Sequence, residues 1–282
     1  MRRRIVPYFL LSPGTIWLVL FFVVPLYYMG KLSLESGVVG NLEFNWNWSN
    51  YSEALSLYDS QFIRSFVYAG VATLLALLLS YPLAYVIAFK AGRWRNALLF
   101  AVVAPFLTTY LIRTLAWETM LSDESPVTEL LHTLGLAPSG HVLATGGAVI
   151  AGLTYNFLPF MLLPIYASLE RIDVRLIEAS KDLYCSAAQG FWRVTLPLSA
   201  PGIVAGTLLT FIPAAGDYVN AQFLGGVGNR MIGNVIQSLY LTQSNYPSAA
   251  ALSFVLMGLI MIAVVVYIRF AGSEALMGEE AV

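Results

Sequence analysis

Long apolar segments alternate with shorter polar ones along this chain of 282 residues. Each apolar segment is hydrophobic on all sides rather than at every second position, which favours helices over the alternating strands of a membrane barrel. A run of about 20 apolar residues is long enough to cross a hydrocarbon layer about 30 Å thick. The pattern predicts an all-α membrane protein whose six transmembrane helices lie at about 8–29, 63–89, 97–117, 142–167, 201–224 and 249–270. We expect one transmembrane domain over residues 1–282.

The composition supports a membrane protein and excludes several other classes. The mean hydropathy is +0.72, and only 11% of the residues are charged, against about 25% in soluble domains. The net charge of −1 and the lack of a basic patch with interleaved aromatic residues exclude a nucleic-acid partner. Cys185 is the only cysteine, and His132 and His141 are the only histidines. We therefore expect no disulfide within the chain and no metal site.

Basic residues define the expected orientation, because arginine and lysine near the ends of membrane helices are retained in the cytoplasm. If the N-terminus is inside, eleven of the 15 basic residues lie on the cytoplasmic side, namely Arg2, Arg3, Arg4, Lys90, Arg93, Arg95, Arg171, Arg175, Lys181, Arg193 and Arg269. Lys31, Arg64, Arg113 and Arg230 remain outside. We expect both termini in the cytoplasm.

Two long segments, 35–61 and 118–141, then lie outside the membrane and are acidic. Their acidic residues are Glu35, Glu43, Glu53, Asp59, Glu118, Asp123, Glu124 and Glu129. A surface of one charge sign produces a potential that attracts the opposite sign, here a cation or a basic partner. The alternative is that both segments are ordinary solvated loops.

A charged insert at about 168–200 separates the fourth and fifth apolar segments. Its charged residues follow helical steps of four, three and four, at Arg171, Arg175, Glu178 and Asp182. Asp173 is a predicted N-cap of a first short helix, and Ser186 with Gln189 fits the capping box of a second. Pro197 and Pro201 are expected to mark the end of this amphipathic part and the start of the fifth span.

Two short helices carried between two membrane helices form a protrusion suited to a groove on another protein. The alternative is an amphipathic segment lying on the lipid surface.

The insert resembles the cytoplasmic signature loop of the membrane subunits of ABC importers. Glu178-Ala179-Ser180, with Val194, Leu196 and Pro197, matches the spacing E-A-A, x3, G, x9, I, x, L, P. The resemblance implies that a coupling helix contacts an ATPase subunit through Glu178, Ala179, Asp182, Leu183, Tyr184, Cys185 and Ser186. Tyr184 stands where this family has glycine, which suits a left-handed turn that costs a bulky residue about 1–2 kcal/mol. Either the turn has another geometry, or Tyr184 accepts the strain for a contact with the ATPase.

Further stretches are similar to spermidine/putrescine-type permeases. They are SYPLAYVIA from Ser80, APFLTTYLIRTLAWETML from Ala104, GLTYNFLPFMLLPIYASLERID from Gly152 and GNRMIGNVIQSLYLTQSNYPSAAALS from Gly228. The resemblance implies a permease of the bacterial inner membrane that imports polyamines, or a related small cationic solute, by alternating access. It implies three kinds of partner: a second permease subunit, an ATPase dimer and an extracytoplasmic substrate-binding protein. The same importer class with another organic solute or ion is the alternative.

No ATP site is expected in the chain itself, and therefore no enzyme activity. The pair Gly30-Lys31 is followed by Leu32 and lacks the upstream glycine of a phosphate-binding loop. ATP and magnesium are thus expected in the partner ATPase.

A stand-alone secondary transporter would explain the apolar segments but not the central insert. An intramembrane aspartyl protease needs two facing acids, and only Asp217 is well placed.

Asp217 is the main candidate for the substrate pathway, because an ionisable residue within a membrane segment costs about 3 kcal/mol on insertion scales and is usually functional. Pro213 and Gly216 precede it and can open the helix, leaving carbonyl groups free. Carboxylates and aromatic faces recognise ammonium groups, so the candidate pathway residues are Asp217, Tyr218, Tyr110, Trp117 and Glu118.

Structural roles are open for several of these residues. Asp217 could pair with Arg113, and Tyr110 and Trp117 could belong to an interfacial aromatic belt. Gly202 and Gly206 are predicted to serve close helix packing rather than substrate contact.

Overall fold

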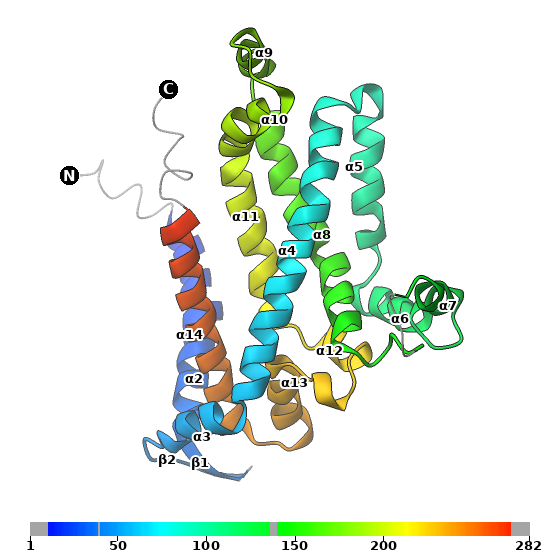
Figure 1. The fold of residues 1–282 in the computed structure, drawn as a ribbon. Helices are drawn as coiled ribbons and strands as arrows, with labels where there is room; N and C mark the ends of the chain where they lie inside the picture. Colours follow the sequence, from blue (N-terminus) through cyan, green and yellow to red (C-terminus); the bar gives the residue numbers. More distant parts are fainter. Residues whose placement is uncertain (1–10, 39, 136–139, 272–282) are drawn as a thin grey trace, which may run out of the picture. The chain divides into compact units, whose positions relative to one another are not determined.

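The computed structural model describes residues 11–38, 40–135 and 140–271, and Figure 1 shows that these are mostly helical. The described part of the chain is helical from its first residue, Leu11. The elements are η1 (Val19–Val23), α2 (Val24–Leu32), β1 (Glu35–Val38), β2 (Asn41–Phe44), α3 (Ser49–Leu57), α4 (Asp59–Phe89), η2 (Gly92–Trp94), α5 (Arg95–Val103), η3 (Ala104–Leu107), α6 (Tyr110–Met120), α7 (Pro126–Thr133), α8 (Gly146–Glu170), α9 (Val174–Asp182), α10 (Ala187–Gly190), η4 (Phe191–Thr195), α11 (Leu196–Ala215), α12 (Val219–Phe223), η5 (Val227–Asn229), α13 (Ile232–Gln237), η6 (Ser238–Thr242) and α14 (Tyr246–Ala271).

Among the described residues, five helical stretches are long and apolar enough to cross a membrane: Leu11–Leu32, Asp59–Phe89, Gly146–Glu170, Ala187–Ala215 and Tyr246–Phe270. A sixth is made of two pieces, Gly92–Leu107 and Tyr110–Met120, which meet at 93°. The predicted all-α membrane class is confirmed, with six segments if the bent pair counts as one.

The third span predicted at 97–117 is present but is not one continuous helix, because the chain bends in its middle. Pro105 has no amide hydrogen for the preceding helical turn, and the chain tightens there into η3. Thr108 and Thr109 then take extended conformations, with ψ of 155° and 145°, while the Thr108 hydroxyl donates to the Pro105 carbonyl at 2.7 Å. Because two consecutive residues leave the helical region, α6 starts in a new direction.

The predicted boundary at Pro197 is also wrong. Helical conformation runs without a break from Ala187 to Ala215, so the second short helix of the insert and the fifth span are one helix. The five residues before α11 form the π turn η4. A π turn accommodates the missing proline amide by shifting the local hydrogen-bond pattern. The helix ends at Ala215, short of the predicted Leu224.

Contacts divide the chain into two compact units, 1–59 with 235–258 and 60–234 with 259–282. Within the first unit, Asn50 of α3 donates from its amide to the carbonyls of Ser33 and Glu35, both at 2.9 Å. This joins α3 to the end of α2 and to the antiparallel hairpin of β1 and β2. The expectation of one domain over residues 1–282 stays a prediction.

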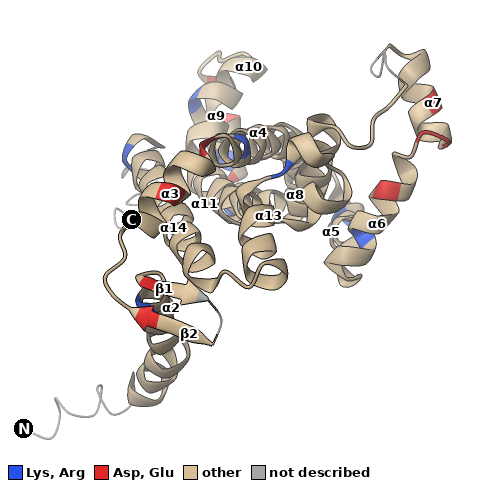
Figure 2. Ribbon diagram, turned by 90° about the horizontal axis from the view of Figure 1, so that it is seen from below, with Lys and Arg blue, Asp and Glu red and all other residues tan. Residues whose placement is uncertain are grey.

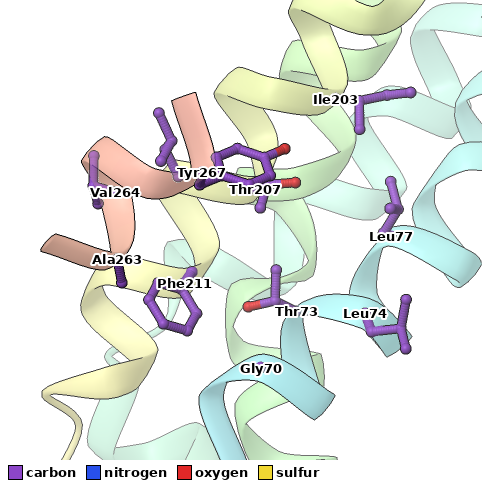
Figure 3. A pocket seen from close by; sticks show the side chains of 11 residues that line it. Gly70, Thr73, Leu74, Leu77, Ile203, Thr207, Phe211, Ala263, Val264 and Tyr267 are labelled. Carbon is purple, nitrogen blue, oxygen red and sulfur yellow. The ribbon is translucent and has the colours of Figure 1, made fainter. Parts of the chain in front are cut away.

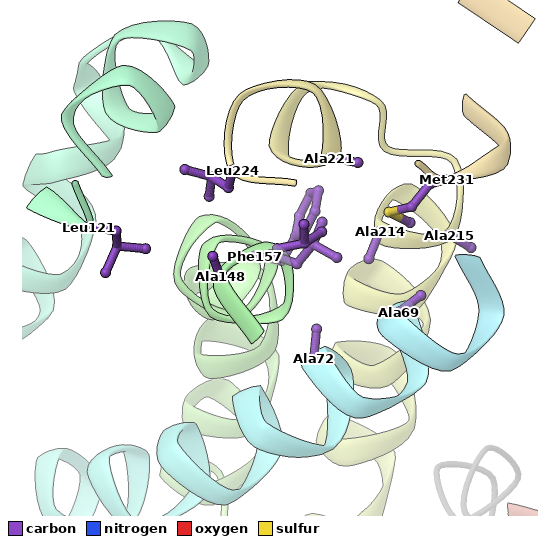
Figure 4. Packing of buried hydrophobic residues seen from close by; sticks show 12 residues of the cluster. Ala69, Ala72, Leu121, Ala148, Phe157, Ala214, Ala215, Ala221, Leu224 and Met231 are labelled. Atoms are coloured by element: carbon purple, nitrogen blue, oxygen red, sulfur yellow. The ribbon is translucent and has the colours of Figure 1, made fainter. Parts of the chain in front are cut away.

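The second unit is built around the contact between α8 and α11. Gly202 and Gly206 let the two backbones approach closely: a Cβ at Gly202 would lie 2.6 Å from the Pro164 carbonyl oxygen, and one at Gly206 would lie 2.9 Å from that of Met161. The predicted packing role of both glycines is confirmed. Small side chains continue the close packing toward α4, where Ala69 and Ala72 face the buried cluster around Phe157 (Figure 4).

We expect Gly202→Ala to destabilise the protein, although alanine is the better helix former. The added methyl would contact both the Pro164 carbonyl and the Ser168 Cβ at 2.6 Å, and overpacking of this kind costs about 1–3 kcal/mol. Gly70→Ala in α4 is the control, because no atom lies within 4 Å of its added Cβ and alanine gains about 0.8–1 kcal/mol in a helix. Thermal unfolding in detergent should give a lower Tm for Gly202→Ala and an equal or higher Tm for Gly70→Ala. The same Tm for both variants would contradict the packing role.

Candidate functional site

The charged insert forms a knob, residues 171–190, that carries α9 beyond the ends of α8 and α11 (Figure 1). Both predicted helix starts are confirmed. The Asp173 carboxylate accepts a hydrogen bond from the Arg175 amide at 3.0 Å. Ser186 and Gln189 form a capping box, with the Ser186 amide donating to Gln189 Oε1 at 2.9 Å and the Gln189 amide donating to Ser186 Oγ at 3.3 Å.

Tyr184 adopts the left-handed conformation that glycine normally occupies at a helix end, with φ of 60°. Its amide donates to the Lys181 carbonyl at 2.9 Å, and the Cys185 amide donates to the Ser180 carbonyl at 3.1 Å. These two bonds define a Schellman motif with Tyr184 at the glycine position. The expected alternative of another turn geometry is therefore wrong. The turn keeps the usual geometry, and Tyr184 adopts the strained left-handed conformation. The Tyr184 side chain is 97% exposed.

The tip of the knob exposes an apolar surface together with its charged residues. Val174, Leu176 and Leu183 are 52%, 50% and 77% exposed. Glu178, Ala179, Asp182 and Ser186 are also exposed, whereas Cys185 is half-buried. Ser180 of α9 is buried, whereas most of the residues predicted to contact an ATPase are exposed.

Asp217 lies in the break between α11 and α12 and is 8% exposed. Its Oδ2 accepts a hydrogen bond from the Tyr110 hydroxyl at 2.5 Å, and its Oδ1 accepts one from the Asn220 amide at 2.8 Å. The predicted pathway residues Asp217 and Tyr110, 107 positions apart in the chain, are thus in direct contact. The carboxylate is buried but hydrogen-bonded, as a buried charge must be.

A buried polar network extends from this pair to α8. The Asn220 side-chain amide donates to the Tyr110 hydroxyl at 2.5 Å, and the Asn156 amide donates to Asn220 Oδ1 at 3.0 Å. Gly152 provides the space, because a Cβ there would lie 2.7 Å from Asn220 Oδ1. The network joins α6, α8 and α12. Sequence reasoning missed Asn156 and Asn220, although a polar amide within an apolar span was a signal that could have identified Asn156.

The alternative ion pair between Asp217 and Arg113 is absent from the described part of the chain. The Arg113 guanidinium instead lies over the Phe106 ring, 4.0 Å from its centroid, and 5.8 Å from that of Tyr110. Stacking on aromatic faces is a usual contact for arginine. Arg113 of α6 therefore contacts Phe106 on the other side of the α5–α6 bend and does not neutralise Asp217.

The other predicted pathway residues lie outside the network. The Trp117 ring packs against Tyr155 with centroids 5.4 Å apart, and Glu118 is half-buried on α6. The Tyr218 side chain is 44% exposed, and its carbonyl accepts a hydrogen bond from the Asn234 amide at 2.8 Å. The Tyr218 carbonyl, close to the opened end of the helix, is therefore not free but connects the loop to α13.

An apolar cavity of about 330 Å³ lies elsewhere in the second unit, between α4, α11 and the last turns of α14 (Figure 3). Its polar groups are the hydroxyls of Thr73, Thr207 and Tyr267, and no charged residue lines it. A cavity without a carboxylate is unsuited to a cationic solute. Among the residues that the structure describes, no three His, Cys, Asp or Glu side chains are placed to hold a metal ion.

Residues 4–271 match the family described as the inner membrane component of binding-protein-dependent transport systems. The chain belongs to this family, and it is a permease subunit of an ABC importer in the inner membrane rather than an enzyme.

Several bacterial relatives are similar over most of the chain. The spermidine/putrescine transport system permease protein PotB of Haemophilus influenzae is 37% identical over 90% of this chain and 90% of its own length. PotB of Escherichia coli is 38% identical over 87% of this chain and 92% of its own. The inner membrane ABC transporter permease protein YdcU of Escherichia coli is 34% identical over 74% of this chain and 69% of its own.

Solved structures show the same fold at low sequence identity. A chain of a bacterial ABC transporter involved in the import of the acidic polysaccharide alginate superposes with a TM-score of 0.68 at 18% identity, covering 96% of both chains. A chain of the MetNI methionine ABC transporter, in an inward-facing conformation, gives 0.54 at 19% identity and covers 77% of this chain and 97% of its own.

We expect Tyr110→Phe to destabilise the protein at the buried network. Asp217 Oδ2 loses its hydroxyl donor, and the side-chain amide of Asn220 loses its acceptor. Leaving a buried polar group without a partner costs about 1–3 kcal/mol. Tyr218→Phe removes the same hydroxyl group from a side chain outside the network, and exposed substitutions usually change stability by less than about 0.5 kcal/mol. Thermal unfolding of the purified protein compares the two variants. Equal Tm values for the two variants would show that the network contributes nothing to the stability of the fold.

Proposed function

We propose that this permease imports spermidine, putrescine or a related small organic cation. The observation that carries the proposal is the similarity to spermidine/putrescine permeases, at 37–38% identity over 87–90% of the chain. A buried carboxylate in the break after α11, in contact with a tyrosine hydroxyl, supports it chemically. Ammonium groups are recognised by carboxylates and aromatic faces, and Asp217 with Tyr110 offers both.

Three kinds of partner complete the proposed transporter. A second permease subunit encloses the pathway together with this chain, and an extracytoplasmic binding protein delivers the solute. An ATPase dimer binds ATP and magnesium and docks against the knob through Glu178, Asp182 and the exposed side chains around Tyr184. The 97% exposed Tyr184 ring and the 77% exposed Leu183 support this docking, because apolar side chains that project together from a surface usually mark an interaction site.

The proposed orientation places the knob and both termini in the cytoplasm. Arg171, Arg175, Lys181 and Arg193 lie in or beside the knob, and basic residues beside membrane helices are retained on the cytoplasmic side. Acidic residues lie on β2, α3 and α7 (Figure 2), in the segments that then face outward. An outward acidic surface would raise the local concentration of a cationic solute.

In the proposed cycle, the described conformation keeps Asp217 closed to solute. The carboxylate is 8% exposed, with Tyr110 and Asn220 on its two oxygens. An ammonium group reaches it only after the Tyr110 hydroxyl moves away. Binding of ATP to the partner supplies the differential affinity that shifts the permease to a state in which α6 and α12 are apart.

We expect Asp217→Asn to lower uptake of a polyamine about tenfold, because hydrogen bonds to charged groups contribute about 1.5–3 kcal/mol and each 1.4 kcal/mol is a factor of ten. The measurement is uptake of labelled spermidine into proteoliposomes that contain the complete transporter, with ATP inside and the loaded binding protein outside.

Glu129→Gln on α7 is the matched control, because it removes one exposed negative charge outside the network. Stimulation of ATP hydrolysis by the loaded binding protein should persist in both variants. Unchanged spermidine uptake in Asp217→Asn, or an equal loss in Glu129→Gln, would contradict the proposed role of Asp217.

A further inference from the structure

Arg95, the first residue of α5, connects this helix to the start of the knob, where the chain leaves α8. Its Nη2 forms an ion pair with Oε1 of Glu170, and its Nε donates to the Tyr166 hydroxyl. The guanidinium also lies over the Tyr166 ring, with 5.1 Å from Cζ to the centroid. Glu170 is the last residue of α8 and lies three positions before Asp173, the N-cap of α9. We call the contact between Arg95, Glu170 and Tyr166 the clamp.

Aromatic contacts connect the end of the knob, where the chain continues into η4, to α4. The Phe191 ring, at the start of η4, meets the Tyr81 ring edge-on with centroids 5.6 Å apart and lies 6.1 Å from Tyr85. The Tyr81 hydroxyl is 2.8 Å from Ser199 Oγ of α11. Ile177 of α9 packs against the same buried cluster. The knob is therefore held at both ends, and a push on α9 reaches α4 and α5 as well as α8 and α11.

The helix held by the clamp leads directly to the Asp217 network. α5 starts at Arg95 and continues through η3 to the bend at Thr108 and Thr109, after which Tyr110 begins α6. One segment thus carries Arg95 against the entry of the knob and Tyr110 against Asp217. Arg113 stacks on Phe106 across the bend, which ties α6 to the end of the preceding segment.

We infer that Arg95 is a positioning residue, which passes movement of the knob through α5 to Tyr110 and so links ATPase docking to the opening of the Asp217 network. This inference rests on the proposed docking of the knob on an ATPase. The Arg95 and Glu170 side chains are 33% and 44% exposed, and ion pairs as exposed as this contribute little to stability. Loss of the clamp should therefore leave the fold intact and change the coupling between ATP hydrolysis and transport.

Charge reversal tests the clamp in the complete transporter in proteoliposomes. Arg95→Glu and Glu170→Arg should each raise the number of ATP molecules hydrolysed per solute transported by about fivefold, the lower end of the usual coupling between linked sites. The double variant restores opposite charges at the two positions and should bring this ratio back toward the wild-type value. Co-purification with the ATPase should be normal in all three variants.

Arg93→Glu is the matched control, since it makes the same charge change two positions away. The Arg93 side chain is exposed and forms no ion pair with another described residue; it lies over the Trp94 ring. Its ratio should equal that of the wild type. Glu170→Gln removes the charge without reversing it, and it replaces the reversed variants if these fail to assemble; its ratio should also rise.

Three results would overturn the inference: a wild-type ratio in the single variants, an equal effect of Arg93→Glu, or normal assembly of the double variant without recovery of the ratio. Failure of the proposed function gives a different result, namely solute uptake by the wild-type protein without any ATPase.

Discussion

The close contact between α8 and α11 is the constraint on which the second unit depends. Gly202 and Gly206 allow the two backbones to meet where any larger side chain would overlap the Pro164 or Met161 carbonyl. The knob is the connection between these two helices, so their packing fixes its two ends. At the other end of the pair, α8 supplies Asn156 and the chain beyond α11 supplies Asp217, so the same packing assembles the buried network.

Knob and network differ in physical character, and each suits its proposed role. The knob is exposed, has a strained tyrosine at its turn and carries several exposed apolar side chains, which suits docking. The network is buried and hydrogen-bonded, so opening it leaves polar groups unpaired unless a ligand replaces the lost partners. In the proposed cycle, a solute with ammonium groups supplies that replacement at Asp217. The clamp joins the two regions through α5, a short path that avoids the length of α8 and α11.

Local patterns predicted much of this structure, and long-range contacts account for what they missed. Hydropathy located the membrane segments, and capping rules located Asp173 and Ser186, because both depend on neighbours within one or two turns. The bend at Thr108 and the unbroken helix through Pro197 depend on how a proline is accommodated by its surroundings, which periodicity does not report. Tyr110 rather than Arg113 contacts Asp217 because tertiary packing, not spacing, selects the partner. Tyr184 shows the reverse: the motif identified the strained position, and the geometry followed it.

Photo-crosslinking from Cys185 tests the central claim most directly, that an ATPase drives this permease through the knob. Cys185 is the only cysteine and directly follows Tyr184, so a maleimide–benzophenone reagent marks this turn in an otherwise unchanged chain. In the assembled transporter, illumination should join the permease to the ATPase subunit, and Glu178→Lys should lower the yield. Crosslinks to lipid alone, with the ATPase present and bound, would contradict the account and place the knob on the membrane surface.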